Sequence, residues 1–263
     1  LTVKGLSKRF ADHVLFENID FEIKRGEHVA IIGDNGSGKT TLMNMLSGIY
    51  HPDAGSILVG GKEVSINSPV DSRNLGIGMI HQHFKLVEVF SAMENIVLGT
   101  KGKRLGRKAL REKIEALGQS FGLEIEPEKK VYDMSVSEKQ TVEILKVLYR
   151  GAQILILDEP TAVLTPQETE RLLKILRRMR EQGCAIIIIT HKLHEVLALT
   201  DRVSVLRKGE YIGTVNTCDA TESSLTEMMV GEKVSLNIDR PEPENPREIL
   251  KVSGLTCLDN EGV

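Results

Sequence analysis

The chain has 263 residues, enough for one large domain or for one domain and part of another. Hydrophobic residues make up 41% of it and aromatic residues only 4%, so we expect a sizeable core built from aliphatic side chains. A formal net charge of −3 gives no overall attraction to nucleic acid or to an anionic membrane surface, and we predict no nucleic-acid partner.

The cysteines and the apolar runs indicate where the protein works. The three cysteines are scattered without the pairing of a metal site, which favours a reducing cytosol. The longest apolar runs, such as residues 185–189, are far too short to cross a bilayer, and nothing resembles a signal peptide. We therefore expect a soluble intracellular protein.

A glycine-rich stretch follows the apolar run HVAII at residues 28–32. Residues 33–40, GDNGSGKT, fit the pattern G-x-x-x-x-G-K-[ST], whose backbone N–H groups cradle phosphates. We expect Lys39 to reach the β- and γ-phosphates and Thr40 to ligate Mg²⁺, at the positive end of the helix that follows. The weaker alternative is an ordinary glycine-rich turn. The predicted nucleotide-binding residues here are Gly33, Asn35, Gly36, Ser37, Gly38, Lys39, Thr40 and Thr41.

Residues 91–150 differ from the rest of the chain because they carry amphipathic helix patterns and no convincing strand. We predict that they form a helical subdomain inserted between strands of the core. The basic segment KGKRLGRKALR, residues 101–111, is either a contact surface or a solvated helix face, and the second interpretation is the stronger one.

Two continuous apolar runs, QILIL at 153–157 and CAIIIIT at 184–190, suit central strands that are buried on both faces. Between them, Thr165 and Glu168 form a capping box with Pro166 at the first helical position. The helix that follows has one apolar stripe, formed by Leu172, Ile175, Leu176 and Met179. Alternation of strands and helices predicts a mainly parallel sheet covered by helices.

Polar residues follow both of these strands. Asp158 and Glu159 end the first one, where a pair of carboxylates is costly unless something there needs charge. Asp158 suits a water-mediated contact to Mg²⁺, and Glu159 suits a general base that polarises the attacking water. A purely structural pair is the alternative. His191 follows the second strand, and we predict a contact with the γ-phosphate, although a lone histidine is more often structural.

The composition changes after residue 231. The acidic, proline-rich stretch DRPEPENP at 239–246 is typical of an extended linker. Beyond it, LKVSGLT at 250–256 repeats the frame of LTVKGLS at 1–7, which is L-x-V-x-G-L-[ST]. We predict a first domain at 1–232, a linker at 233–247 and the truncated start of a second copy at 248–263.

These pieces, in this order, resemble an ATP-binding cassette (ABC) ATPase over residues 1–232. The resemblance implies an α/β fold, with a P-loop NTPase (RecA-like) core around a parallel central sheet, an antiparallel β subdomain and an inserted α-helical subdomain. It implies ATP and Mg²⁺ as cofactors, and catalytic roles for Glu159, His191 and Gln82. Gln82, in MIHQHF, matches the glutamine that senses Mg²⁺ and the transmembrane partner. Phe10 matches the aromatic residue that stacks on adenine, with a core phenylalanine at a strand end as the alternative.

The signature of the family, usually LSGGQ, reads MSVSE here, and it opens a helix that reaches the ATP of a partner cassette. The matching residues are Ser135, Val136, Ser137 and Glu138. We expect Ser137 and Gln140 to form a capping box that preserves the helix start. Glu138 favours the helix dipole but is expected to repel a γ-phosphate.

The altered signature, Thr165 after DEPT and a second cassette after a short linker resemble the tandem ATPases of bacterial importers for simple sugars and nucleosides. MIHQHFKL, residues 79–86, is similar to the nucleoside type. The implied partners are a second cassette in the same full-length chain, a membrane permease and, indirectly, a solute-binding protein, with the ATPase peripheral on the inner face of the cell membrane. The alternatives are a soluble ABC ATPase of translation or DNA repair, and a regulatory module that binds nucleotide without turnover.

Overall fold

The computed structural model describes residues 1–11, 13–100, 106–232, 251–254 and 256. Contacts divide the chain into a large unit, Leu1–Lys233, and a second unit, Val234–Val263. The residues described in the second unit contain no helix or strand. The predicted linker at 233–247 lies outside the described residues, as does most of the predicted second copy at 248–263.

A six-stranded sheet forms the centre of the large unit, with the strand order β10-β9-β3-β8-β7-β6. Neighbouring strands from β9 to β6 are parallel, and β10 is antiparallel to β9. The strands are β3 (His28–Ile32), β6 (Ile77–Ile80), β7 (Ile154–Asp158), β8 (Ala185–Ile189), β9 (Arg202–Arg207) and β10 (Glu210–Asn216). The runs that were predicted to be central strands are β7 and β8, and both are buried along their whole length.

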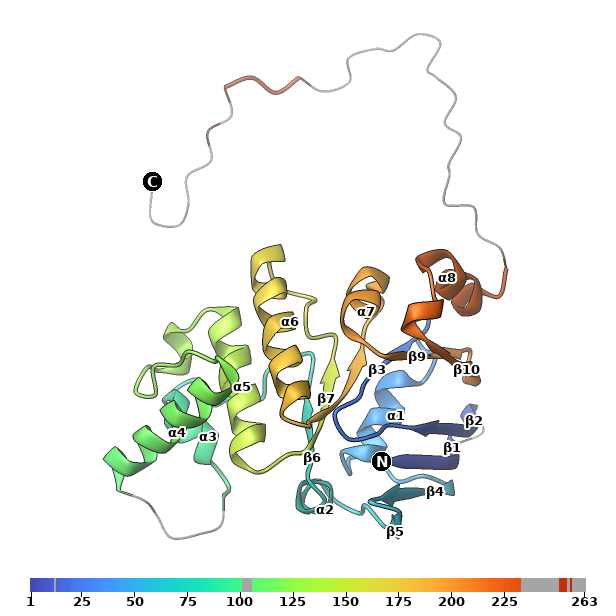
Figure 1. Cartoon of the computed structure of the whole chain (residues 1–263), viewed down its shortest axis with the longest axis horizontal. Helices are drawn as coiled ribbons and strands as arrows, with labels where there is room; N and C mark the ends of the chain where they lie inside the picture. The colour runs from blue at the N-terminus through green and yellow to red at the C-terminus, as the bar shows by residue number, and fades with distance from the viewer. Residues whose placement is uncertain (12, 101–105, 233–250, 255, 257–263) are drawn as a thin grey trace. The chain divides into compact units, whose positions relative to one another are not determined.

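A second sheet has four antiparallel strands in the order β2-β1-β4-β5. They are β1 (Thr2–Phe10), β2 (His13–Glu22), β4 (Ala54–Val59) and β5 (Lys62–Val64). In Figure 1 this sheet lies at the end of the unit opposite the helices α3, α4 and α5.

The helix α1 (Lys39–Leu46) packs between the two sheets because it is apolar on several sides. Leu42, Met43, Met45 and Leu46 are fully buried, and they share one core with residues of β1, β2 and β4 and of β3, β7 and β8. Since side chains alternate along a strand, Val29 and Ile31 of β3 enter this core while Ala30 and Ile32 face the other side of the sheet.

Helices cover the opposite face of the central sheet (Figure 1). They are α5 (Val136–Tyr149), α6 (Pro166–Glu181), α7 (Leu193–Leu199) and α8 (Glu222–Val230). The predicted capping box of α6 is confirmed: Thr165 accepts a hydrogen bond from the Glu168 N–H, and the four residues of the predicted stripe are buried. Two short elements remain: α2 (Pro69–Asn74) lies beside β6 and α1, where the Ser72 hydroxyl donates to the Leu46 carbonyl, and the 3₁₀ turn η2 (Thr217–Asp219) lies beside α7.

The helical group between β6 and β7 consists of α3 (Ala92–Val97), α4 (Arg107–Phe121), the 3₁₀ turn η1 (Val131–Asp133) and α5. Among the described residues of 91–150 no extended strand occurs. The basic segment lies partly outside the described residues; its described part is a solvated face of α4, where Arg107 pairs with Glu128 and Arg111 pairs with Glu115.

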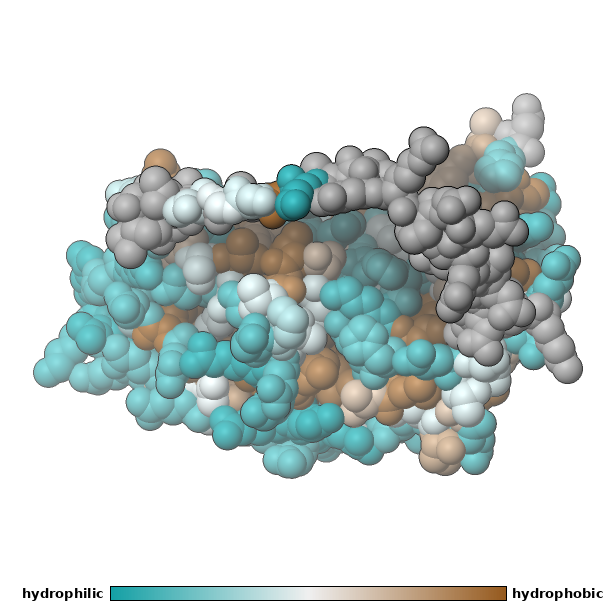
Figure 2. Space-filling view, turned by 90° about the horizontal axis from the view of Figure 1, so that it is seen from above, coloured by the Kyte–Doolittle hydropathy of each residue, from teal (hydrophilic) through white to brown (hydrophobic). Residues whose placement is uncertain are grey.

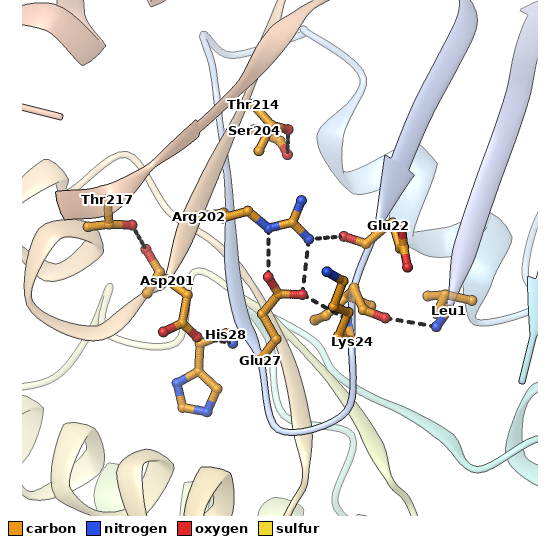
Figure 3. A network of polar contacts seen from close by, with 12 residues as sticks. Leu1, Glu22, Lys24, Glu27, His28, Asp201, Arg202, Ser204, Thr214 and Thr217 are labelled. Carbon is orange, nitrogen blue, oxygen red and sulfur yellow. Dashed lines mark hydrogen bonds and ion pairs between the residues drawn. The ribbon is translucent and has the colours of Figure 1, made fainter. Parts of the chain in front are cut away.

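Polar contacts join the two sheets near the start of β3 (Figure 3). Arg202 at the start of β9 donates two hydrogen bonds to the Glu27 carboxylate, 2.6 and 3.0 Å long, and a third of 2.7 Å to the carbonyl of Glu22, the last residue of β2. The paired charges lower the pKa of Glu27, although partial burial opposes them. This contact fixes the N-terminal end of β3, and with it the strand that leads into the glycine-rich loop.

The fold-class prediction is confirmed: the unit has a mainly parallel central sheet, an antiparallel sheet and an inserted helical group. The face drawn in Figure 2 is mostly hydrophilic, with hydrophobic residues in small separate areas. None of the helices in the described part of the chain combines the length and the apolar character needed to cross a membrane.

Candidate active site

Three polar segments meet because the strands that precede them are parallel neighbours. In the register of the sheet, Ile189 at the end of β8 lies beside Ile31 of β3 and beside Asp158 of β7. The glycine-rich loop after β3, the carboxylates at the end of β7 and His191 after β8 therefore lie at one edge of the sheet. The carboxyl ends of parallel strands are where open α/β sheets bind ligands.

The loop of residues 33–38 needs glycine at two positions for different reasons. Gly33 has φ 153°, and a Cβ built there would lie 2.0 Å from the carbonyl oxygen of Leu206. Gly38 is left-handed with φ 95°, and its Cβ would lie 2.7 Å from the Phe16 ring. The loop can thus pack its backbone against β9 and β2, which leaves its N–H groups at the start of α1.

Lys39 is the first residue of α1 and is buried, with 8% of its surface exposed. Its ammonium group donates to the carbonyl oxygens of Gly33 (2.7 Å) and Asp34 (2.8 Å) and to the hydroxyl of Ser37 (3.2 Å). Burial lowers the pKa of Lys39, although the nearby charges of Glu159, Asp34 and Asp158 oppose this effect. A phosphate at the loop would give this cation a charged acceptor in place of neutral ones.

Asp158 and Thr40 offer a pair of oxygen ligands that fits Mg²⁺. The Thr40 side chain lies close enough to the Asp158 carboxyl group to act against the rise of the Asp158 pKa, and Thr40 is exposed. Burial and the neighbouring charge of Glu159 raise the pKa of Asp158. A cation bound at this carboxyl group would therefore stabilise its ionised form. No group of three or more acidic, histidine or cysteine ligands occurs among the described residues. Mg²⁺ takes one or two protein ligands plus waters and phosphate oxygens.

Glu159 and His191 are in direct contact. The His191 Nδ1 atom lies 3.0 Å from Glu159 Oε1, and the other carboxylate oxygen of Glu159 is buried without a partner among the described residues. Glu159 has φ 48°, which is unusual for a residue with a side chain. Its backbone N–H donates to the Ile189 carbonyl at 2.9 Å. The pair can orient and deprotonate a water molecule, with the imidazole sharing the proton.

The other predicted site residues lie around this centre. Gln82 is exposed and follows β6, two residues beyond its last residue, Ile80, which pairs with Leu157 of β7. Phe10 ends β1 and is 44% exposed, which excludes the core alternative; its ring lies edge-on to Tyr50 at 5.6 Å. Asn35 and Gly36 are exposed, Ser37 is buried and Thr41 is half-buried on α1.

The signature residues open α5, but the predicted capping box was two residues out of place. The N-cap is Ser135, not Ser137: its hydroxyl accepts from the Glu138 N–H, and the Glu138 carboxylate accepts from the Ser135 N–H at 2.7 Å. The other oxygen of Glu138 accepts from Lys129 at 2.6 Å. Partial burial would raise the pKa of Glu138, but these hydrogen bonds outweigh it and hold the pKa below its usual value.

The ionised carboxylate of Glu138 is therefore paired with Lys129 and bonded to the start of its own helix, where an unpaired negative charge was expected. Val136 is exposed and Ser137 is half-buried. No hydrogen bond or ion pair among the described residues joins the signature to the glycine-rich loop.

Sequence reasoning missed several polar residues that support the site. They are Lys129, Thr161, Lys192 and Glu195, and Gln140 has a different role from the capping role that was predicted for it. Gln140 is buried on α5 and donates to the Pro160 carbonyl at 2.7 Å. Thr161 and Lys192 are each close in sequence to a predicted catalytic residue, which was the only available signal. Lys129 pairs with Glu138, 9 residues away, and the Thr161 hydroxyl that bonds to Glu195 is 34 residues away along the chain, so neither contact has a local signal.

Comparison with known proteins identifies the family. The model of the ABC transporter family matches residues 16–162, which include the glycine-rich loop, Gln82, the signature, Asp158 and Glu159. The chain belongs to the ABC transporter family. The match ends before His191 and begins after Phe10, so the predicted roles of these two residues are supported only by their positions in the fold.

Curated relatives share the sequence along almost the whole chain. The nucleoside import ATP-binding protein NupA of Lactococcus lactis is 46% identical over 98% of this chain and 51% of its own length. The ribose import ATP-binding protein RbsA 2 of Streptomyces coelicolor is 43% identical over 97% of this chain and 50% of its own. The chain thus spans about half the length of the curated relatives it matches.

A solved ABC structure has the same fold. The structure of cbiO1 from Clostridium perfringens, part of the transporter complex cbiONQ, is 31% identical and superposes with a TM-score of 0.73, over 83% of this chain and 88% of its own. The similarity in both sequence and fold supports transferring the roles of the site residues as proposals.

Proposed function

We propose that this chain is the ATP-hydrolysing cassette of an importer that energises uptake of a small hydrophilic solute, a nucleoside or a simple sugar, through a separate membrane permease. The main support is that the phosphate loop, the Asp158 carboxyl group and the Glu159–His191 pair lie together at one edge of the sheet. The names of the curated relatives reported above, which import nucleosides and ribose, support the solute class.

The residues divide the chemistry of ATP hydrolysis among them. The loop N–H groups and Lys39 hold the β- and γ-phosphates, and Thr40, Asp158 and, through its position after β6, Gln82 would hold Mg²⁺. The metal supplies charge that stabilises the leaving phosphate oxygens. Glu159 accepts the proton of the attacking water, and His191, in contact with Glu159, holds that carboxylate and faces the γ-phosphate. Phe10 lies exposed at the end of β1 and offers its ring to adenine.

The active site is completed by a second cassette. Residues 135–138 open α5 and are exposed or half-buried, and we propose that they approach the ATP of a partner cassette, and that the partner's signature covers the nucleotide at Lys39. The curated relatives are about twice as long as this chain. We propose that the second cassette follows in the same full-length protein, with residues 233–247 as the linker and 248–263 as its start.

A groove on the helical group suits the permease contact. It is lined by residues of the end of α2, the segments preceding β6 and β7, and α3, α4 and α5, among them Arg73, Gly76, Leu98 and Arg150. Gln82 does not line it, but Gly76 precedes β6 and Gln82 follows this strand, so four residues of β6 connect the groove to the active site. Permease motion at the groove would thus reach Gln82. We propose a protein that is peripheral on the inner face of the cell membrane.

Solute uptake tests this proposal. In cells that depend on the complete protein, Glu159→Gln is expected to abolish uptake of either labelled adenosine or labelled ribose, and the tagged wild-type protein is expected to copurify with a membrane permease. Unchanged uptake of both solutes, together with recovery of the protein from the soluble fraction alone, would instead favour a soluble ABC ATPase of translation or DNA repair.

A further inference from the structure

A buried polar cluster joins the two loops that carry Glu159 and His191. Glu195 on α7 is 6% exposed, and its Oε2 atom accepts a hydrogen bond of 2.7 Å from the hydroxyl of Thr161, which is 1% exposed. The other oxygen of Glu195 lies 3.3 Å from the ammonium group of Lys192. Lys192 also donates to the Thr161 carbonyl at 2.8 Å. The three residues therefore close a ring of contacts.

Two members of the ring lie next to a reacting group along the chain. Thr161 lies two residues after Glu159, and Lys192 directly follows His191. The Lys192 N–H also donates to the Thr190 hydroxyl at 3.1 Å, which fixes the turn on both sides of His191. The ring thus ties the loop after β7 to the loop after β8 at a point one or two residues from the Glu159–His191 contact.

The apolar surroundings of the ring strengthen these hydrogen bonds. Leu172 and Leu176 of α6 and Val196 and Leu199 of α7 line the space beside Thr161 and Glu195. In such apolar surroundings a charged hydrogen bond is stronger than in water, and an unpaired buried carboxylate is costly. The ring has both of its charges paired, so its lowest-energy state is the one in which the two loops are joined.

The conformation of Glu159 shows why a restraint is needed. Its φ of 48° is unfavourable for a residue with a side chain and persists only where the surroundings hold it. The loop is held by the backbone bond from Glu159 to Ile189, by Gln140 at the Pro160 carbonyl and by the ring at Thr161. Of these, only the ring also fixes the loop that carries His191 through side chains.

We propose that Thr161, Glu195 and Lys192 form a clamp that positions Glu159 against His191, so that the three are positioning residues for hydrolysis and not for nucleotide binding. This inference rests on the proposed ATPase function. In the described part of the chain, no hydrogen bond or ion pair joins the clamp to the glycine-rich loop or to Lys39, so loss of the clamp should leave ATP affinity unchanged. A misplacement of about 1 Å at a reacting group can cost about 10²-fold in rate.

Steady-state kinetics of the complete protein test the clamp. Thr161→Val and Glu195→Gln are expected to lower kcat by about 10- to 10²-fold while KM for ATP changes by less than about twofold. Thr161→Ser, which keeps the hydroxyl, is expected to retain most of the activity. Thr200→Val is the matched control, because Thr200 is also buried and bonds to Thr217 and Val196 away from both loops. Equal kcat in Thr161→Val and Thr200→Val would overturn the clamp, as would a rise in KM that accounts for the whole loss.

A spectroscopic readout separates failure of the clamp from failure of the ATPase proposal. In this chain, labelled at histidine nitrogen and assigned with His191→Gln, the Nδ1 resonance of His191 reports its contact with Glu159. Thr161→Val is expected to move this resonance in the direction that Glu159→Gln moves it, and Thr200→Val is expected to leave it in place. A resonance unmoved by Thr161→Val would overturn the clamp even if hydrolysis is normal. If Thr161→Val moves the resonance but the complete wild-type protein shows no ATP turnover, the clamp is supported and the ATPase proposal is refuted.

Discussion

His28 is predicted to make the stability of the chain depend on pH. It is the first residue of β3 and is fully buried; its Nδ1 atom lies 3.3 Å from the Leu199 carbonyl oxygen, and its Nε2 atom has no partner among the described residues. Figure 3 shows its ring beside Asp201 and below the Arg202–Glu27 pair. Burial lowers the pKa of His28 from 6.5 to about 4, with the charge of Arg180 acting in the same direction.

The sign and size follow from the difference in proton binding. Well above pH 6.5 the histidine is neutral in both states, so it adds no pH dependence. As the pH falls from 6.5 towards 4, the unfolded chain binds a proton that the folded chain does not, and the free energy of unfolding decreases. A separation of about 2.5 pH units corresponds to about 3 kcal/mol in full, and to about 2 kcal/mol between pH 7.5 and pH 5.

Denaturant unfolding of the chain at fixed ionic strength measures this effect. His28→Gln keeps a donor for Leu199 but does not titrate. The difference in the free energy of unfolding between wild type and His28→Gln is therefore expected to shift by about 2 kcal/mol, at the expense of the wild type, from pH 7.5 to pH 5. His51→Gln, at an exposed histidine, is the control and is expected to follow the wild type. If the free energy of unfolding depended on pH in the same way for wild type and His28→Gln, His28 would not be the source of the effect.

Three further substitutions address the site. Lys39→Ala is expected to weaken ATP binding by several kcal/mol, since charged hydrogen bonds to phosphate contribute about 1.5–3 kcal/mol each; near-normal affinity by calorimetry would contradict this. Glu159→Gln is expected to keep ATP binding but to slow hydrolysis by the complete protein about 10²-fold, and turnover at wild-type speed would exclude Glu159 as the base. Lys129→Met frees the charge of Glu138, so it is expected to weaken ATP-driven association with the second cassette, and adding Glu138→Gln is expected to restore it. Lys130→Met, which removes the pair with Glu94, is the control in sedimentation experiments, and equal behaviour of the two lysine variants would contradict the role of Lys129.

The parts of the site that the sequence predicts are those defined by local spacing. The glycine-rich loop, the strand before it and the helix after it lie within 20 residues, and Thr165, Pro166 and Glu168 fix the start of α6 within four. The same local rule was ambiguous at α5, because Ser135 with Glu138 and Ser137 with Gln140 both fit a capping box. The structure selects the first pair because Glu138 then also meets Lys129, while Gln140 turns inwards to Pro160.

The supporting contacts could not be predicted because they join distant segments. Thr161 and Glu195 come together only once β7 and β8 pair and α7 folds back along the sheet. Glu195 alone looks like one more charged residue on a short helix, and its burial depends on the apolar faces of α6 and α7. His28, likewise, is indistinguishable in sequence from a solvated histidine at a strand start.

We propose that the chain provides one half of a composite ATP-hydrolysing site, and this proposal is tested by the dependence of the ATPase rate on protein concentration. With sedimentation run in parallel, we expect that the chain alone binds Mg-ATP, remains largely monomeric and hydrolyses slowly, with a rate that rises faster than linearly with concentration. Addition of the second cassette is predicted to restore turnover at the site that contains Glu159. Fast turnover in strict proportion to concentration, from a species that sediments as a monomer, would contradict the claim.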